Sequence, residues 1–94
     1  MIRVNPMKQH PDYILREVAG SMVLVPVGEA TREFPGMVTM NPTSVYLWET
    51  LKTPQTAETL VEAILSKFDA DPDQARKDVD KFLHTLTLIG AVIE

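Results

Sequence analysis

Residues 36–51 read Gly-Met-Val-Thr-Met-Asn-Pro-Thr-Ser-Val-Tyr-Leu-Trp-Glu-Thr-Leu, which predicts a short strand that turns directly into a helix. Asn41 is a favoured N-cap, because its side-chain oxygen can accept from a free N–H group of the first helical turn. Pro42 follows at the first helical position, where its fixed φ suits a helix and its missing N–H costs nothing. This junction divides the chain, since strands are expected before it and helices after it.

Three strands are predicted before the junction. Residues 13–18 and 22–27 are rich in strand formers and flank a turn candidate at Gly20, so we expect them to form a hairpin. Pro26 cannot donate to a strand ladder, so it should lie near a strand end or at an unpaired position. The third strand, residues 37–40, is so short that we expect it at a sheet edge. The unpaired N–H and C=O groups of an edge can recruit another chain.

Three helices are predicted after the junction. The first carries Trp48 on its apolar face and ends before Pro54. The second opens at Thr56 and has an apolar stripe. The third opens at Asp71 and stops at Gly90, a residue suited to the left-handed conformation. The apolar stripe of the second helix comprises Leu60, Val61, Ile64, Leu65 and Phe68.

This order of elements predicts an α+β fold: a three-stranded antiparallel sheet followed by a three-helix bundle, similar to a winged helix-turn-helix unit. Residues 1–12 contain two prolines and are expected to form a flexible N-terminal arm. Residues 13–94 are expected to form one domain, because 94 residues suffice for a single core and are too few for two.

The composition narrows the range of functions. The formal net charge of −4 argues against a nucleic-acid partner, because phosphate binding normally needs a basic surface. The chain has no cysteine, no signal-peptide pattern and no apolar run long enough to span a bilayer. We therefore expect a cytoplasmic protein without a membrane partner.

Catalytic motifs are missing from the sequence. It has no Ser/His/Asp spacing, no Gly-rich phosphate loop and no cluster of metal-ligand residues. His84 lies on the third helix and is read as a solvated position. We predict no catalytic residue, no metal site and no cofactor, and hence no enzymatic activity.

Two observations remain open from the residues alone. Met37 and Met40 fit two roles equally well. They could pack as ordinary strand residues or line an adaptable binding groove, since methionine is flexible and polarizable. Leu88 falls off the core face of the third helix, on the side of Lys77, Lys81 and His84. Next to an open edge strand, it becomes a candidate groove residue.

The chain resembles the PqqD family over residues 13–94. The resemblance rests on residues 36–48, on Thr59-Leu60-Val61, on residues 78–86 and on the closing Gly90-Ala91-Val92-Ile93. The shared pattern is a strand that ends in Asn, a Trp about seven residues later and a third helix of the Asp-Val-x-x-Phe-Leu-x-x-Leu type before a Gly.

The resemblance implies a non-catalytic adaptor that binds the leader of a ribosomally made precursor peptide. Such domains present the leader to a modifying enzyme, often a radical SAM enzyme, and only some of them serve PQQ biosynthesis. The leader is expected to add as a strand to the third strand and to lie against the third helix. Carried onto this sequence, the peptide-binding residues are Met37, Val38, Thr39, Met40, Asp78, Lys81, Phe82 and Thr85. The alternative helix face is Lys77, His84 and Leu88.

Two other functions fit the predicted fold. One is a winged-helix DNA-binding regulator, which the mixed charge of the third helix disfavours. The other is a structural subunit that forms a homodimer through the edge strand. If strand addition is the function, the substitution Val38→Pro is expected to weaken peptide binding while the helices stay folded.

Overall fold

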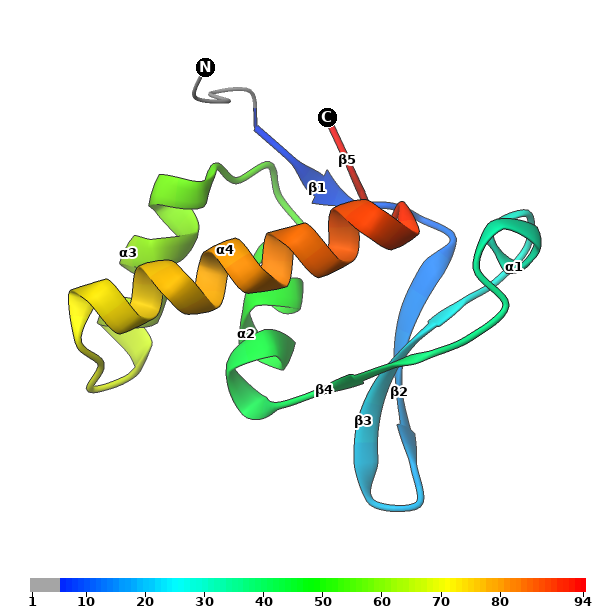
Figure 1. Cartoon of the computed structure of the whole chain (residues 1–94), viewed down its shortest axis with the longest axis horizontal. Helices are drawn as coiled ribbons and strands as arrows, with labels where there is room; N and C mark the ends of the chain where they lie inside the picture. The colour runs from blue at the N-terminus through cyan, green and yellow to red at the C-terminus, as the bar shows by residue number, and fades with distance from the viewer. Residues whose placement is uncertain (1–5) are drawn as a thin grey trace.

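A three-stranded antiparallel sheet lies beside the helices in the computed structural model, which describes residues 6–94 (Figure 1). The strand order β2-β3-β4 places β4 at one edge, as predicted. The strands span Tyr13–Val18 (β2), Ser21–Pro26 (β3) and Val38–Met40 (β4). The predicted α+β class and antiparallel sheet are confirmed.

The β2–β3 hairpin closes through a two-residue turn. Val18 pairs with Ser21, and the intervening Ala19 and Gly20 both have positive φ angles, of 51° and 84°. Positive φ at both central residues is typical of a type I′ turn, whose twist matches that of the flanking strands. Pro26 is the last residue of β3, which confirms the strand-end position expected from its missing N–H.

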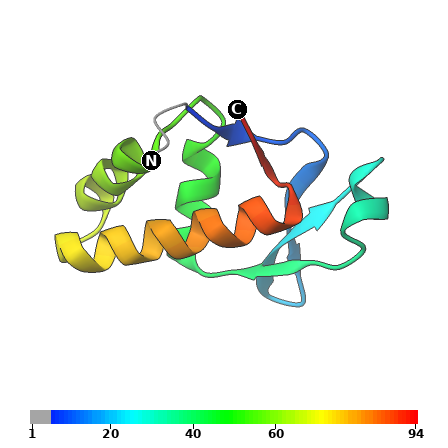
Figure 2. The same ribbon diagram turned by 45° about the horizontal axis from the view of Figure 1, so that its top comes forward.

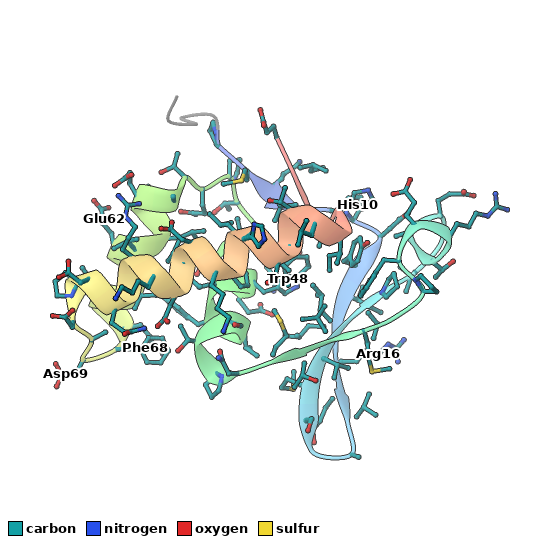
Figure 3. All side chains as sticks on the ribbon, viewed as in Figure 1. His10, Arg16, Trp48, Glu62, Phe68 and Asp69 are labelled. Carbon is teal, nitrogen blue, oxygen red and sulfur yellow. The ribbon has the colours of Figure 1, made fainter. Side chains whose placement is uncertain are left out.

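The strand-to-helix junction forms as the sequence predicts. The side chain of Asn41 accepts from the backbone N–H of Ser44 at 2.8 Å, and Pro42 is the first residue of α2 (Pro42–Thr50). Trp48 is only 2% exposed and lies below the long helix α4 in Figure 3. It is therefore the core residue that the apolar face of this helix predicted.

Two further helices complete the core. Helix α3 (Ala57–Lys67) begins with a reciprocal capping box between Thr56 and Thr59. Helix α4 (Pro72–Ile89) is capped by Asp71 and ends at Gly90, whose φ of 77° is left-handed as expected. Leu65, a member of the apolar stripe of α3, is 39% exposed, so it lies at the edge of the face that packs on the core. The buried residues of that stripe are Leu60 and Ile64.

Residues 7–9 do not form the flexible arm that the sequence analysis expected. Strand β1 (Lys8–Gln9) pairs antiparallel with β5 (Val92–Ile93), and the two strands lie side by side in Figure 2. Met7 is 8% exposed and exchanges two backbone hydrogen bonds of 2.7 Å with Gln55. Two-residue strands have no detectable periodicity, which explains why the pattern missed them. The first five residues of the expected arm lie outside the described residues.

A short helix, α1 (Ala30–Glu33), lies in the connection between β3 and β4. Its one buried residue, Ala30, joins the core beside the sheet. A single turn carries too few apolar positions to show a helical period. No helix within residues 6–94 combines the length and apolar character needed to cross a membrane.

Candidate functional site: a groove between strand β4 and helix α4

Strand β4 pairs on one side only within the described part of the chain. Its register with β3 joins Met22 to Met40, Val23 to Thr39 and Leu24 to Val38. The other side of β4 has no strand partner among residues 6–94. One row of its backbone groups is therefore free of sheet pairing.

The direction of each backbone group in β3 follows from one hydrogen bond at the start of the hairpin. The N–H of Val27 donates to the carbonyl of Asp12 at 2.7 Å, so these opposed residues form a hydrogen-bonded pair. Hydrogen-bonded and non-hydrogen-bonded pairs alternate along an antiparallel ladder. In the unbroken register of β2 and β3, Val23 therefore directs its backbone toward β2, and its neighbours Met22 and Leu24 direct theirs toward β4.

The same alternation then sets the free edge of β4. Val38 and Met40 stand opposite Leu24 and Met22, so their backbone N–H and C=O groups point toward β3. Thr39 points its N–H and C=O groups the opposite way, out of the sheet. Within β4, Thr39 is thus the residue whose backbone is available to an added strand.

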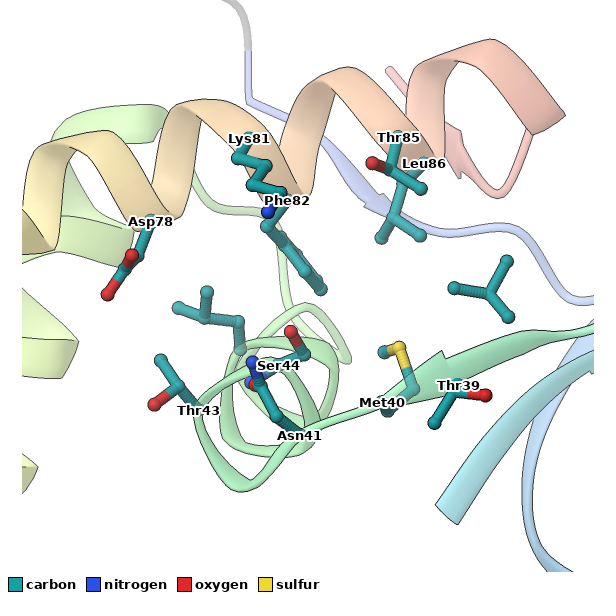
Figure 4. A pocket seen from close by; sticks show the side chains of 12 residues that line it. Thr39, Met40, Asn41, Thr43, Ser44, Asp78, Lys81, Phe82, Thr85 and Leu86 are labelled. Atoms are coloured by element: carbon teal, nitrogen blue, oxygen red, sulfur yellow. The ribbon is translucent and has the colours of Figure 1, made fainter. Parts of the chain in front are cut away.

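A groove with a cavity volume of about 280 Å³ separates this edge from α4 (Figure 4). We call it the β4–α4 groove. Its walls come from β4, from the first turns of α2 and from the middle of α4. The lining residues are Val38, Thr39, Met40, Asn41, Thr43, Ser44, Leu47, Asp78, Lys81, Phe82, Thr85 and Leu86.

The groove has an apolar floor and a polar rim. Met40, Phe82 and Leu86 in the floor are each at most 6% exposed, so most of their surface already packs in the core. The rim carries both charges, Asp78 and Lys81, one turn apart on α4. The Asp78 carboxylate accepts from the Gln74 amide at 2.9 Å, whereas Lys81 is exposed and has no ion pair within residues 6–94. An extended segment with apolar and acidic side chains would complement these walls.

The structure brings together seven of the eight residues that the resemblance assigned to peptide binding. Met37 is the exception, because it precedes β4, is 57% exposed and does not line the groove. Of the alternative helix face, Lys77 and the 73% exposed Leu88 lie outside the groove. His84 lines a different hollow.

Five lining residues were not predicted from the sequence: Asn41, Thr43, Ser44, Leu47 and Leu86. Four of them follow β4 directly, in the N-cap and first turns of α2. The immediate strand-to-helix junction could have indicated this, because without a loop the start of α2 must lie beside the end of β4. Their role as groove wall depends on the path of α4, which no local pattern shows.

The second hollow lies on another side of α4. It is lined by Met7, Ala57, Glu58, Arg76, Asp80, Leu83, His84 and Thr87, and its cavity volume is about 550 Å³. Arg76 and Glu58 form an exposed ion pair at 3.1 Å across it. Among residues 6–94, no group of three or more His, Cys, Asp or Glu side chains is placed to hold a metal ion.

Known structures share this fold. The chain superposes on "TbiB1 in Complex with the TbiA(beta) Leader Peptide" with a TM-score of 0.69 and 16% identity, covering 90% of this chain and 93% of that one. It superposes on "Lasso peptide synthetase B1 complexed with the leader peptide" with a TM-score of 0.69 and 15% identity, covering 94% and 98%. At such low identities the likeness concerns the fold alone.

The family assignment rests on the sequence match. No similarity to a curated protein was found. The family model described as coenzyme PQQ synthesis protein D (PqqD) matches residues 21–92, which include β3, the whole β4–α4 groove and the first residue of β5. This match covers well over half of the chain and confirms the resemblance, so the chain belongs to the PqqD family.

Proposed function

We propose that this protein binds the leader of a ribosomally made precursor peptide and presents it to a modifying enzyme. The observation that carries the proposal is the free edge of β4 beside the β4–α4 groove. An extended peptide added to such an edge gains main-chain hydrogen bonds, and side-chain pockets provide specificity. Both similar structures are complexes with a leader peptide, which supports the same class of ligand.

The protein acts in this proposal as an adaptor and not as a catalyst. The partner enzyme is a radical SAM enzyme or another peptide-modifying enzyme, in line with the family resemblance. A reconstituted reaction tests this part, with the precursor and the modifying enzyme encoded beside this protein. Modification of the precursor should require the adaptor, and equal product with and without it would contradict the presenting role.

Peptide binding is tested by titrating the ¹⁵N-labelled domain with synthetic leaders of neighbouring precursor peptides. The largest amide shifts should fall on Thr39 and on the groove-lining part of α4, residues 78–86. Shifts that avoid both β4 and α4 would refute the proposed site.

The charge of Lys81 offers a matched pair of variants. Lys81→Glu should weaken the binding of a leader with an acidic residue by roughly twofold to fivefold, the range of an exposed ion pair. Lys77→Glu makes the same charge change on the same helix but outside the groove, so it should leave the dissociation constant unchanged. Calorimetric titration measures both, and equal losses would show a general charge effect and not a local contact.

The free edge also admits a second copy of the chain, which is the structural-subunit alternative. Self-pairing would make the apparent mass rise with concentration in sizing experiments. A leader that binds β4 should then dissociate the dimer. An unchanged dimer at saturating leader would place the self-association elsewhere.

A further inference from the structure

If a peptide adds to β4 as proposed above, the side chains of β4 determine the sequence pattern that the groove selects. In β4 the side chains of Val38 and Met40 lie on the face that packs on the core, whereas exposed Thr39 lies on the opposite face. The backbone of Thr39 is the one directed away from β3. Along this edge, the residue with the free backbone is therefore the one whose side chain points away from the core.

An added strand must copy this alternation. The peptide residue directly opposite Thr39 shares its face of the sheet, so its side chain points away from α4. The two residues on either side of it point toward the groove floor, beside Phe82 and Leu86. This holds for a parallel as well as an antiparallel peptide, because the side-chain period of a strand is two in both directions.

We infer that the groove recognises a peptide segment of the form apolar-any-apolar, whose central residue lies opposite Thr39. In an antiparallel complex, that central residue exchanges both backbone hydrogen bonds with Thr39. The two flanking residues bury their side chains against the apolar floor. The backbone of Thr39 therefore fixes the register of the peptide. The apolar floor selects the two peptide residues that flank the central one.

The absence of cysteine makes the register measurable by cross-linking. A single cysteine introduced by Thr39→Cys is the only thiol of the variant, and a second cysteine is moved stepwise along a peptide. The peptides are chosen from a random display library on the immobilised full-length chain. Disulfide formation requires Cα atoms about 4.4–6.8 Å apart, a range that a directly opposite pair satisfies. Only the peptide residue opposite Thr39 should cross-link efficiently.

The same peptides then undergo two scans. Alanine at either groove-facing position should lower the affinity about tenfold, and alanine at the cross-linked position by less than about twofold. Replacing the backbone amide of the cross-linked residue by an ester should lower the affinity by about threefold to tenfold in an antiparallel complex. Losses from alanine and from esters should thus fall on alternate residues.

Different results would contradict the inferred register and the proposed function. Peptides that bind the groove but cross-link at several positions, or whose alanine losses recur every three or four residues, overturn the register and leave leader binding intact. Leaders that shift neither Thr39 nor α4 in the titration above overturn the proposed function itself. A library that yields no groove binder overturns the inferred apolar-any-apolar pattern, and the leader titration decides the proposed function separately.

Discussion

Tyr13 shows how a single residue joins distant parts of this fold. It is 4% exposed, and its hydroxyl donates a hydrogen bond to the carbonyl of Ile89 at the end of α4. Burial raises the pKa of the Tyr13 hydroxyl above its usual 10.0, and the carboxylates of Glu33 and Asp12 add to the effect. The neutral phenol is therefore the form that the folded state prefers.

The pKa of Tyr13 predicts a loss of stability in alkali. The unfolded chain releases this proton near pH 10, whereas the folded chain retains it to higher pH. A raised folded-state pKa contributes stability that is complete below the unfolded pKa and is lost as the pH rises through the folded value. The free energy of unfolding should therefore fall above about pH 10.

Tyr13→Phe tests this assignment by urea unfolding across a pH series. At neutral pH the variant should lose about 0.5–1.5 kcal/mol with its hydrogen bond to Ile89. Above about pH 10 its stability should fall less steeply than that of the wild type, because one ionisation is removed. Parallel curves for the two proteins in alkali would contradict the role of Tyr13.

At the scale of elements, the β2–β3 hairpin carries a conformational cost in its turn. Ala19 has a φ of 51°, a conformation that costs an alanine roughly 1–2 kcal/mol. Asparagine tolerates this region better, and Asn-Gly is the favoured type I′ pair. The turn was predictable from Gly20, but the strain at Ala19 was not, because alanine gives no signal of a left-handed conformation.

The turn therefore predicts that Ala19→Asn stabilises the protein. The free energy of unfolding should rise by about 0.5–1 kcal/mol, as measured by denaturant unfolding. Gly20→Ala is the opposing control, because a Cβ there meets nothing within 4 Å and only the φ of 84° opposes it. It should lower the stability by about 1–2 kcal/mol. Equal stabilities in the two variants would exclude a left-handed turn.

For the molecule as a whole, the β1–β5 pair joins residues 8–9 to residues 92–93. Met7 anchors this pair to the loop before α3 through its backbone hydrogen bonds with Gln55. The backbone N–H of Gln9 donates to the carbonyl of Leu51 at 2.9 Å. Residues 7–9, which were expected to belong to a flexible arm, are therefore held against the rest of the fold. Removal of these contacts should destabilise the fold without touching β4.

A pair of methionine variants tests this arrangement. Met7→Ala should cost about 2 kcal/mol of unfolding free energy, because it removes a side chain that is 8% exposed. Met37→Ala removes the same atoms from a residue that is 57% exposed, so it should change stability by no more than about 0.5 kcal/mol. Thermal and denaturant unfolding measure both. A Met7 variant as stable as the Met37 variant would mean that the β1–β5 pair contributes little.

Tertiary structure also decides which backbone groups are free, and here it corrects an expectation of the sequence analysis. Val38→Pro was expected to weaken binding while the helices stay folded. The register directs the backbone of Val38 toward β3, so this variant would remove a ladder hydrogen bond from the sheet itself. Thr39 is the residue of β4 whose backbone should be tested. Its outward direction could be worked out only once the β2–β3 register was known.

Elements with local causes can be predicted from the residues alone. Asn41 and Pro42 start α2, Asp71 starts α4 and Gly90 ends it, because caps and φ preferences act within a few residues. The order of these elements placed a short strand at a sheet edge. Only the tertiary structure brought α4 beside that edge and turned Thr39 outward, because the groove and the free backbone depend on packing and register between residues far apart in the chain.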